Sequence, residues 1–341
     1  MSPAPVFLSH PSSLQHDTGP HPEQPARISA VEAGMAQNDW VGYERVASPP
    51  AAIADLTAVH PAEHVEMIEA AARAGGAQID ADTVVSAGSY TAARHAAGGA
   101  VALVDGLLDG PFAPGSFSAH RPPGHHAERA RAMGFCLFNN VAVAATHALG
   151  RGLERVMIVD WDVHHGNGTE AIFEADPRVL FVSIHQSPLY PGTGAAGFRG
   201  IRDGAGYTVN LPVAAGAGDA TFTALVQGVC VPLARAYRPQ LLLVSAGFDA
   251  HREDPLADCM VTESGYATMG ATLRDVCAEL GVPFGGLLEG GYALDALGRS
   301  VVATLTAFSG IPDAVAEPDA ALAVPEVAQA RRGLAQHWPA L

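Results

Sequence analysis

Short apolar stretches alternate along the chain with longer segments whose apolar residues recur at helical spacing. The stretches predicted as strands cover residues 3–9, 116–120, 155–160, 179–185, 207–212, 240–249 and 283–292. The segments predicted as helices begin near Ala26 and cover 61–74, 89–109, 138–150, a stretch from about 168, 219–237, 262–280 and 293–308. Buried strands that alternate with helices are typical of a parallel sheet covered on both faces. The pattern therefore predicts an α/β fold.

The tail that begins at about Ile311 is richer in proline and alanine than the rest of the chain. No internal repeat or convincing linker interrupts the alternation before it. We therefore expect a single domain over residues 1–341, with about 311–341 forming a peripheral, partly helical extension.

Composition and charge narrow the function classes. The chain has 341 residues, of which 48% are hydrophobic and 16% charged, and this composition supports a sizeable core. The formal net charge of −16 argues against a surface that binds the phosphates of a nucleic acid. An acidic surface also attracts cationic substrates such as lysine-bearing peptides or polyamines, but solubility alone explains it equally well.

The cysteines and the first residues of the chain bear on its location. Cys136, Cys230, Cys259 and Cys277 form no CxxC pair, and we interpret them as reduced thiols. The chain shows neither the basic and apolar regions of a signal peptide nor an apolar run of the roughly 18 residues that a membrane span needs. We therefore expect a cytoplasmic protein without a membrane partner. The sequence leaves the oligomeric state open, a homo-oligomer included.

The polar residues that follow the predicted strands have an unusual chemistry. Asp160, Asp162, His164 and His165 fall within six residues after the apolar run 155–159. Other predicted strands lead to further imidazoles and carboxylates, namely His120, His125, His126, His185, Asp249, His251 and Glu289. Because the carboxyl ends of parallel strands meet at one edge of the sheet, we expect these groups to converge there. Together they have the composition of a metal site.

The spacing of Asp162 and His164 places both side chains on one side of an extended segment. Asp249, from another strand end, is a third candidate ligand. Two carboxylates and one imidazole suit Zn²⁺ or Fe²⁺ and leave positions open for water and substrate. Taken singly, each residue is equally well explained as a strand-end cap or a packed histidine. Taken together, uncompensated carboxylates at neighbouring strand ends would repel one another and lose solvation.

Two further motifs add groups suited to catalysis. His125 and His126 follow a predicted strand and a Pro-Pro bend, and adjacent imidazoles can transfer protons to and from one substrate near neutral pH. Gly290 and Gly291 let the backbone turn sharply before Tyr292, whose phenol suits a developing oxyanion. Each motif alone is more often an ordinary loop or turn.

Several motifs, in this order, resemble the histone deacetylase superfamily, which includes bacterial amidohydrolases and acetylpolyamine deacetylases. They are RPPGHHA, GFCLFNN, VDWDVHHGNGT, YPGTG, SAGFDAH, DPL and EGGY, and the early HDTGPHPEQPARI (16–28) resembles the family's N-terminal signature. The similarity runs from about residue 7 to 308. It implies the arginase–deacetylase fold, a single eight-stranded, mostly parallel sheet with helices on both faces.

The resemblance implies a set of catalytic residues. His125, oriented by Asp160, looks like the base of a proton-transferring pair. His126, oriented by Asn167, looks like the partner that protonates the leaving amine. Tyr292 matches the tyrosine that polarises the acyl carbonyl opposite the metal.

The resemblance also implies ligands for ions and substrate. The ligands implied for Zn²⁺ are Asp162, His164 and Asp249. Those implied for an inner structural K⁺ are Asp160, Asp162, His164, Ser183 and Ile184. Those implied for an outer K⁺ are Phe173, Asp176, Val179 and Tyr207. The residues implied for the substrate tunnel are Gly134, Phe135, Tyr190, Leu256 and, at its rim, either Asp82 or Asp80. Arg27 resembles an arginine near an internal channel through which acetate leaves.

Three departures from the family pattern refine the expected substrate. Asn167 stands where class I members carry an aspartate, and together with Trp161 it resembles the class II pattern. A neutral amide should leave the pKa of His126 lower than an aspartate would. Tyr190 replaces the commoner phenylalanine, and Leu256 stands where polyamine-selective members carry an acidic gatekeeper. We therefore favour acyl-lysine or a similar N-acyl amine over acetylpolyamines.

The resulting hypothesis is a zinc-dependent amidohydrolase, a hydrolase of linear amide C–N bonds, acting on acetylated lysine peptides or small N-acyl amines, with Fe²⁺ as an alternative metal. Acetylpolyamine deacetylation and a weakly active module that binds acyl amides are the alternatives. An arginase-like dinuclear site is disfavoured, because the two positions that would carry its extra ligands are Gly166 and His251, neither a carboxylate.

Overall fold

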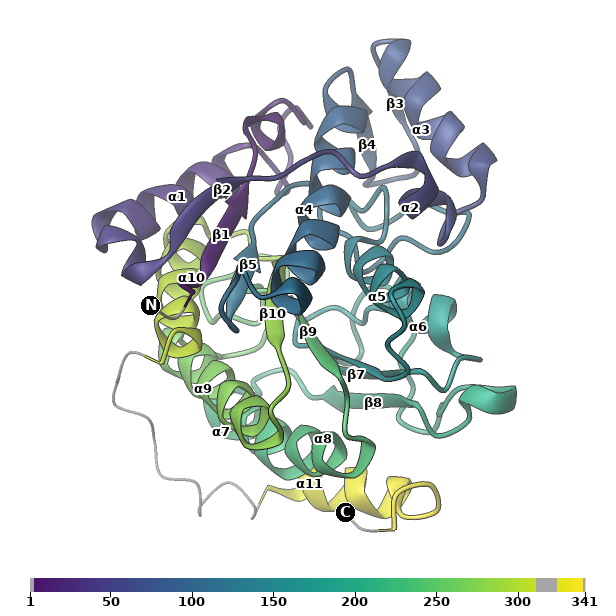
Figure 1. Cartoon of the computed structure of the whole chain (residues 1–341), viewed down its shortest axis with the longest axis vertical. Coiled ribbons are helices and arrows are strands. Elements are labelled where there is room, and N and C mark those ends of the chain that lie inside the picture. Colours follow the sequence, from purple (N-terminus) through teal and green to yellow (C-terminus); the bar gives the residue numbers. More distant parts are fainter. Residues whose placement is uncertain (1–2, 311–323, 340) are drawn as a thin grey trace.

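Eight strands form one parallel sheet in the computed structural model, which describes residues 3–310, 324–339 and 341 (Figure 1). The strands are β1 (Val6–Ser9), β2 (Glu44–Ala47), β5 (Ser116–Ser118), β6 (Val156–Asp160), β7 (Val179–Gln186), β8 (Thr208–Val213), β9 (Leu241–Ala246) and β10 (Phe284–Leu288). Their order across the sheet is β2-β1-β5-β10-β9-β6-β7-β8, and every pairing is parallel. The predicted α/β fold with an eight-stranded sheet is confirmed.

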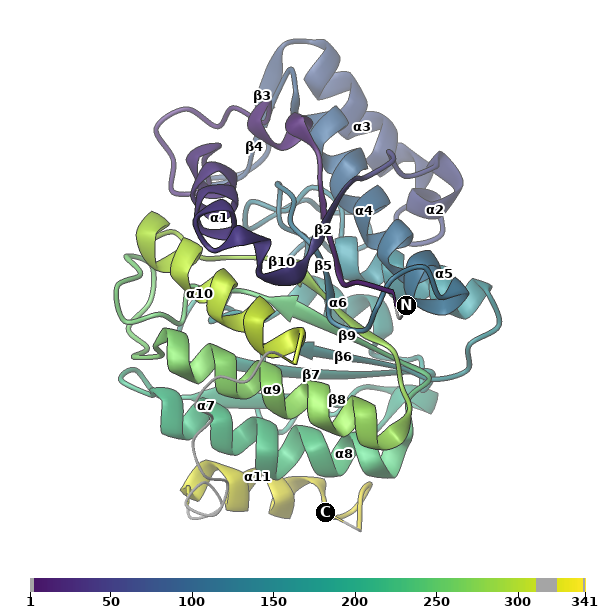
Figure 2. The same cartoon turned by 60° about the vertical axis from the view of Figure 1, so that its left-hand side comes forward.

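Helices cover both faces of this sheet. They are α1 (Ala26–Gln37), α2 (Ile53–Thr57), α3 (Ala62–Arg73), α4 (Ser89–Asp109), α5 (Asn140–Gly150), α6 (Asn167–Phe173), α7 (Asp219–Leu225), α8 (Val231–Tyr237), α9 (Glu263–Leu280), α10 (Leu294–Phe308) and α11 (Pro325–Leu334). Side chains of α1 and α7 to α11 contribute to one apolar core, and side chains of α2 to α6 contribute to the other. Figure 2 shows α7 to α10 layered against the sheet, with α11 outside α7 and α8.

The central strand β6 shows why its residues form a strand in this place. Val156 and Ile158 pack into one core, whereas Met157 and Val159 pack into the other. Successive side chains of a strand point to opposite faces, so a continuous apolar run suits a strand that is buried on both. The run ends at Asp160, which is paired in register with Ser183 of β7 and Ser245 of β9. The first polar residue of the strand therefore lies at the carboxyl edge of the sheet.

The structure also corrects the predicted elements. The sequence pattern missed β2, because this edge strand is mostly solvent-exposed and carries no apolar run. It also missed the separate hairpin of β3 (Gly76–Gln78) and β4 (Val84–Ser86). The strands predicted to reach residues 249 and 292 end at Ala246 and Leu288, and the remainder forms loops. The helix predicted over 219–237 is interrupted by a π-helical turn, Val226–Cys230.

The C-terminal helix α11 packs against the domain through Val327 and Leu334, which are buried in the same core as α7 to α10. Residues 311–323 and 340 of the predicted extension lie outside the described part of the chain. In that described part, none of the helices is both long enough and apolar enough to cross a lipid bilayer.

Candidate active site at the carboxyl edge of the sheet

Asp162, His164 and Asp249 come together just beyond the ends of β6 and β9. Each can offer one ligand atom such that these atoms all lie within 4.8 Å of one another, and all three residues are buried. His164 Nδ1 lies 3.2 Å from an oxygen of Asp162 and 3.1 Å from an oxygen of Asp249. The predicted metal-ligand set is therefore assembled in one place.

Backbone groups hold the two carboxylates of this triad. The N–H of Gly290 donates to Asp162 at 2.8 Å, and the N–H of Val163 donates to Asp249 at 2.9 Å. A Cβ at Gly290 would overlap both carboxylates, and one at Gly247 would overlap Asp162. Glycine at these positions thus serves close packing against the triad, and not only a sharp turn.

The electrostatics of the triad fit a bound cation. Burial raises the pKa of Asp249 to about 7, and the charge of Asp162 adds to the effect. Burial disfavours a charge on His164, but hydrogen bonds to Asp162 and Asp249 outweigh it and raise the pKa of His164 to about 10. Two buried carboxylates thus hold a proton between them on the imidazole. A divalent cation would supply the same compensation, and the oxygen and nitrogen donors suit one.

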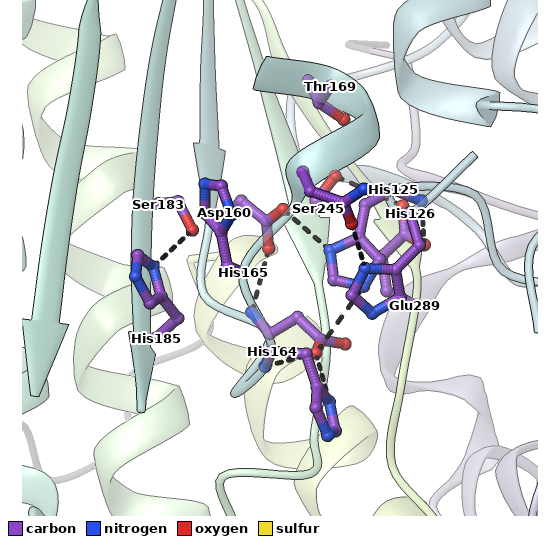
Figure 3. Close-up of polar contacts among 12 residues, drawn as sticks. His125, His126, Asp160, His164, His165, Thr169, Ser183, His185, Ser245 and Glu289 are labelled. Carbon is purple, nitrogen blue, oxygen red and sulfur yellow. Dashed lines mark hydrogen bonds and ion pairs between the residues drawn. The ribbon is translucent and has the colours of Figure 1, made fainter. Parts of the chain in front are cut away.

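The histidine pair lies beside the triad, and each imidazole has its own partner. Figure 3 shows His125 and His126 side by side, with Asp160 next to His125. His125 Nδ1 donates to Asp160 at 2.9 Å, and His126 Nδ1 donates to Asn167 Oδ1 at 2.8 Å. The ring centroids of the two histidines are 4.0 Å apart. Both partners are those that the family resemblance implied, and the structure brings all four residues together.

The amide of Asn167 determines which nitrogen of His126 carries a proton. Its Nδ2 donates to a carboxylate oxygen of Glu128 at 3.0 Å, so its Oδ1 faces the imidazole as an acceptor. His126 Nδ1 must therefore be the donor, and in the neutral ring Nε2 keeps the lone pair. Burial and the neighbouring His125 and His164 hold the pKa of His126 well below its ordinary value.

His125 has the opposite electrostatic environment. Burial disfavours its charge, but the carboxylates of Asp162 and Asp160 outweigh this and raise the pKa of His125 well above its ordinary value. Its Nε2 lies 3.7 Å from Asp162, on the side of the metal triad. The two neighbouring imidazoles are thus driven toward different protonation states, as expected for groups with different roles in proton transfer.

Glu289 is a buried residue beside the histidine pair to which the sequence pattern assigned no role. One of its oxygens accepts from the backbone N–H groups of Gly124 at 2.6 Å and His125 at 3.1 Å, and the other accepts from Ser245 Oγ at 3.2 Å (Figure 3). The residue is fully buried, and burial raises its pKa to about 7. Its place directly after an apolar strand marked it as a polar residue at the sheet edge but did not indicate these contacts.

A cavity of about 200 Å³ reaches His164 of the triad. It is lined by Asp82, His126, Gly134, Phe135, His164, Leu189, Tyr190, Leu256 and Tyr292. The structure thereby gathers all the residues predicted for the tunnel and adds Leu189, which sequence reasoning missed. Asp82, not Asp80, lines this cavity: Asp80 accepts instead from the backbone N–H groups of Asp82 and Thr83.

Tyr292 is held between two neighbours on the cavity wall. The guanidinium of Arg27 lies 4.9 Å from the centroid of its ring, and the ring of Phe135 meets it edge-on at 5.7 Å. Arg27 is fully buried, and its Nε donates to the carbonyl of Gly291 at 2.6 Å. These contacts place Arg27 behind the tyrosine, and its part in a product channel stays a prediction.

The two predicted potassium sites map to neighbouring segments. For the inner site, the pairing of β6 with β7 places Asp160 beside Ser183, whose Oγ lies 2.9 Å from His185 Nδ1. For the outer site, the N–H of Asp176 donates to the carbonyl of Phe173, and that of Val179 to the carbonyl of Asp176. The carbonyl of Tyr207 accepts from Phe181 on β7. Occupation of both sites by K⁺ stays a prediction.

This parallel sheet, with its metal triad and histidine pair at one edge, defines a class of hydrolases that act on amide bonds. The chain belongs to the histone deacetylase family, since residues 21–308 match the model of the histone deacetylase domain.

Relatives and a solved structure support this membership. A protein of Methanothermobacter thermautotrophicus named "Probable deacetylase" is 40% identical over 309 residues, which cover 89% of this chain and 91% of that protein. The histone deacetylase-like amidohydrolase of Pseudomonas aeruginosa is 39% identical over 281 residues, with 80% and 72% covered. The crystal structure of the HDA15 HD domain superposes with a TM-score of 0.91 at 36% identity, with 99% and 96% covered.

Proposed function

We propose that this chain is a zinc-dependent amidohydrolase that removes the acetyl group from acetyl-lysine or a similar N-acyl amine. One observation carries the proposal: His164 of the candidate metal triad, His126 and Tyr292 all line one narrow cavity. A divalent ion held by Asp162, His164 and Asp249 would polarise the acyl carbonyl and make the attacking water more acidic. Zn²⁺ and Fe²⁺ both suit these ligands.

His126 is the residue best placed to move the proton of the attacking water. It lines the cavity, and its Nε2 carries a lone pair because Nδ1 donates to Asn167. The family resemblance implied His125 as the base, but these contacts favour the reverse division of roles. In this assignment His126 accepts the proton and then delivers it to the departing amine. His125, paired with Asp160, keeps its positive charge and stabilises the negative charge that develops beside it.

Tyr292 supplies the second stabilising group for the acyl oxygen. Burial raises the pKa of its phenol well above the ordinary value, so the O–H donor persists at neutral pH. A donor aimed at the oxyanion contributes more in the transition state than in the ground state, because the charge on the oxygen has increased there.

The walls of the cavity favour a slender, uncharged stem. Phe135 and Tyr190 supply aromatic surfaces, and Leu256 supplies an aliphatic one in place of an acidic gatekeeper. Asp82 is the one carboxylate among the residues that line the cavity, and it suits the backbone N–H groups of a peptide at the rim. These features support acyl-lysine over acetylpolyamines.

A substrate panel tests the proposal. The protein, loaded with Zn²⁺ or Fe²⁺, is assayed with an acetyl-lysine peptide, acetylputrescine, acetylspermidine, trifluoroacetyl-lysine and longer acyl-lysines. The readout is the released acetate or longer acyl acid, because acetylputrescine and acetylspermidine already carry free amines that an amine-reactive dye would label. We expect the highest kcat/KM for acyl-lysine. The Asp249→Asn variant should show no measurable turnover of any substrate in the panel.

Three outcomes would contradict the proposal in different ways. Faster turnover of acetylspermidine would reassign the substrate to polyamines. Binding of the acetyl-lysine peptide at full metal content, without release of acetate, would indicate a binding module. Two tightly bound Mn²⁺ ions per chain would indicate dinuclear chemistry.

A further inference from the structure

Asp254 accepts hydrogen bonds from two residues that line the substrate cavity, Leu256 and Tyr292, without lining the cavity itself. One of its carboxylate oxygens accepts from the backbone N–H of Leu256 at 3.0 Å. The other accepts from the backbone N–H groups of Tyr292 at 2.7 Å and Ala293 at 3.3 Å. The residue is buried, and its own N–H donates to the carbonyl of His251 at 2.8 Å. A single side chain thus joins the gate residue to the segment that carries the phenol.

These contacts require a carboxylate and not merely a polar side chain. A carboxylate has two oxygens and accepts hydrogen bonds on both sides, whereas an amide of the same shape has one oxygen and one donor. An amide at this position could therefore satisfy the Leu256 side or the Tyr292 side, but not both. On the unsatisfied side a donor would face a donor.

The backbone of the tyrosine segment depends on this carboxylate. Arg27 and Phe135 contact the ring of Tyr292, but they do not bond its N–H. Gly291, just before it, has a φ of +119°, a conformation in which a residue without a side chain is unstrained. Asp254 accepts from the two N–H groups that follow this glycine.

We propose that Asp254 is a positioning residue that couples the Leu256 gate to the phenol of Tyr292. The proposal rests on the function proposed above and adds a device for specificity. A substrate stem that fits against Leu256 leaves the Tyr292 backbone in place, and the phenol then meets the acyl oxygen. A stem that displaces Leu256 shifts the phenol as well. Discrimination at the gate therefore appears in kcat and not only in KM.

A double-mutant cycle tests the coupling. Asp254→Asn and Leu256→Ala are each made in the parent and in the Tyr292→Phe background, with kcat and KM measured on an acetyl-lysine peptide at full metal content. A misplaced catalytic group costs up to about 100-fold in rate, so we expect Asp254→Asn to lower kcat by about 10- to 100-fold. In the Tyr292→Phe background the further loss should be under about threefold.

Leu256→Ala should likewise lower kcat, and its effect should shrink in the Tyr292→Phe background. Asp258→Asn is the matched control, because Asp258 is an exposed aspartate of the same loop that contacts Gln186 and does not line the cavity. It should leave kcat unchanged. Equal losses in the two backgrounds, or a change confined to KM, would overturn the coupling. If Asp254→Asn does not fold, the Leu256→Ala cycle decides the question alone.

Hydrogen–deuterium exchange gives a readout that does not depend on activity. Asp254→Ala, which removes both acceptor oxygens, should speed exchange in residues 255–257 and in residues 290–294 together, while Asp258→Ala speeds exchange in neither segment. If Asp254 served only as the acceptor for the N–H groups just before α10, exchange would become faster in residues 290–294 alone, and the proposal would be wrong. A parent protein that released no acyl group from any substrate would contradict the proposed function, and the exchange result would still decide the coupling.

Discussion

The side-chain oxygen of Asn167 accepts a hydrogen bond from His126 Nδ1 at 2.8 Å, so the imidazole that lines the substrate cavity has a neutral partner. The neighbouring His125 has a charged one, since Asp160 accepts from its Nδ1 at 2.9 Å. A carboxylate favours the protonated imidazole and an amide does so much less. The difference between the two partners therefore favours a protonated imidazole at His125 and a neutral one at His126.

Replacing Asn167 by aspartate should raise the pKa of His126. An opposite charge at this distance shifts a pKa by about one to three units. If His126 acts as the base, it must be neutral, and the acidic limb of the kcat/KM profile should then move to higher pH by about that amount. The profile is measured on an acetyl-lysine peptide at constant metal content. A limb that stays in place, or moves to lower pH, would remove His126 from the base role.

Tyr292→Phe should lower kcat by about 100-fold or more, since removal of one oxyanion donor commonly costs about 2.7–4 kcal/mol. KM should change far less, because the phenol acts mainly on the transition state. The kinetics are measured at full metal content, with Tyr90→Phe on α4 as a control for the loss of a hydroxyl away from the cavity. Turnover at the parent rate would show that the phenol does not polarise the carbonyl.

Two substitutions of Glu289 should distinguish the effect of its negative charge from the effect of its hydrogen bonds to the backbone. Glutamine still accepts from the N–H groups of Gly124 and His125, but it removes a negative charge that helps to raise the pKa of His125. Glu289→Gln should therefore melt near the parent temperature and lose about tenfold in kcat. Glu289→Ala leaves two buried N–H groups without an acceptor, at about 1–3 kcal/mol each, and should melt much lower. Equal melting temperatures for the two variants would argue against the backbone role.

The sequence predicted those parts of the fold and site that depend on local pattern. The apolar runs of β6, β7, β9 and β10 identified the buried strands, and the polar residues just after them identified Asp162, His164 and Asp249. This worked because parallel strands bring their carboxyl ends to one edge. The edge strand β2 lacked such a run and was missed.

Other features depend on contacts between distant segments, which no local pattern records. Glu289 and Asp254 act by accepting hydrogen bonds from backbone N–H groups of other loops, so neither could be assigned a role from its neighbours in sequence. Asp80 and Asp82 are equivalent in sequence. Only the turn geometry, in which Asp80 accepts from the N–H groups of Asp82 and Thr83, shows which of the two lines the cavity.

Metal binding should strengthen as pH rises. In the metal-free protein the pKa of His164 is raised to about 10 and that of Asp249 to about 7, so an incoming ion must displace protons from these ligands. Each displaced proton makes the apparent affinity rise by about tenfold per pH unit. Between pH 7 and 9 the ion displaces only the proton of His164. Below pH 7 it displaces the proton of Asp249 as well. Competition with a chelator at several pH values measures this slope.

The same shifts fix the sign of the stability change. A histidine whose pKa is raised on folding stabilises the metal-free protein fully below its unfolded pKa of about 6.5, and this contribution is lost as pH rises toward 10. A carboxyl group whose pKa is raised makes the folded protein progressively less stable as pH rises from about 4 to 7. The metal-free protein should therefore become less stable as the pH rises. The difference in Tm between the metal-loaded and the chelated protein should grow from pH 6 to pH 9. A Tm difference that stays constant over this range would mean that Asp162, His164 and Asp249 do not hold the ion.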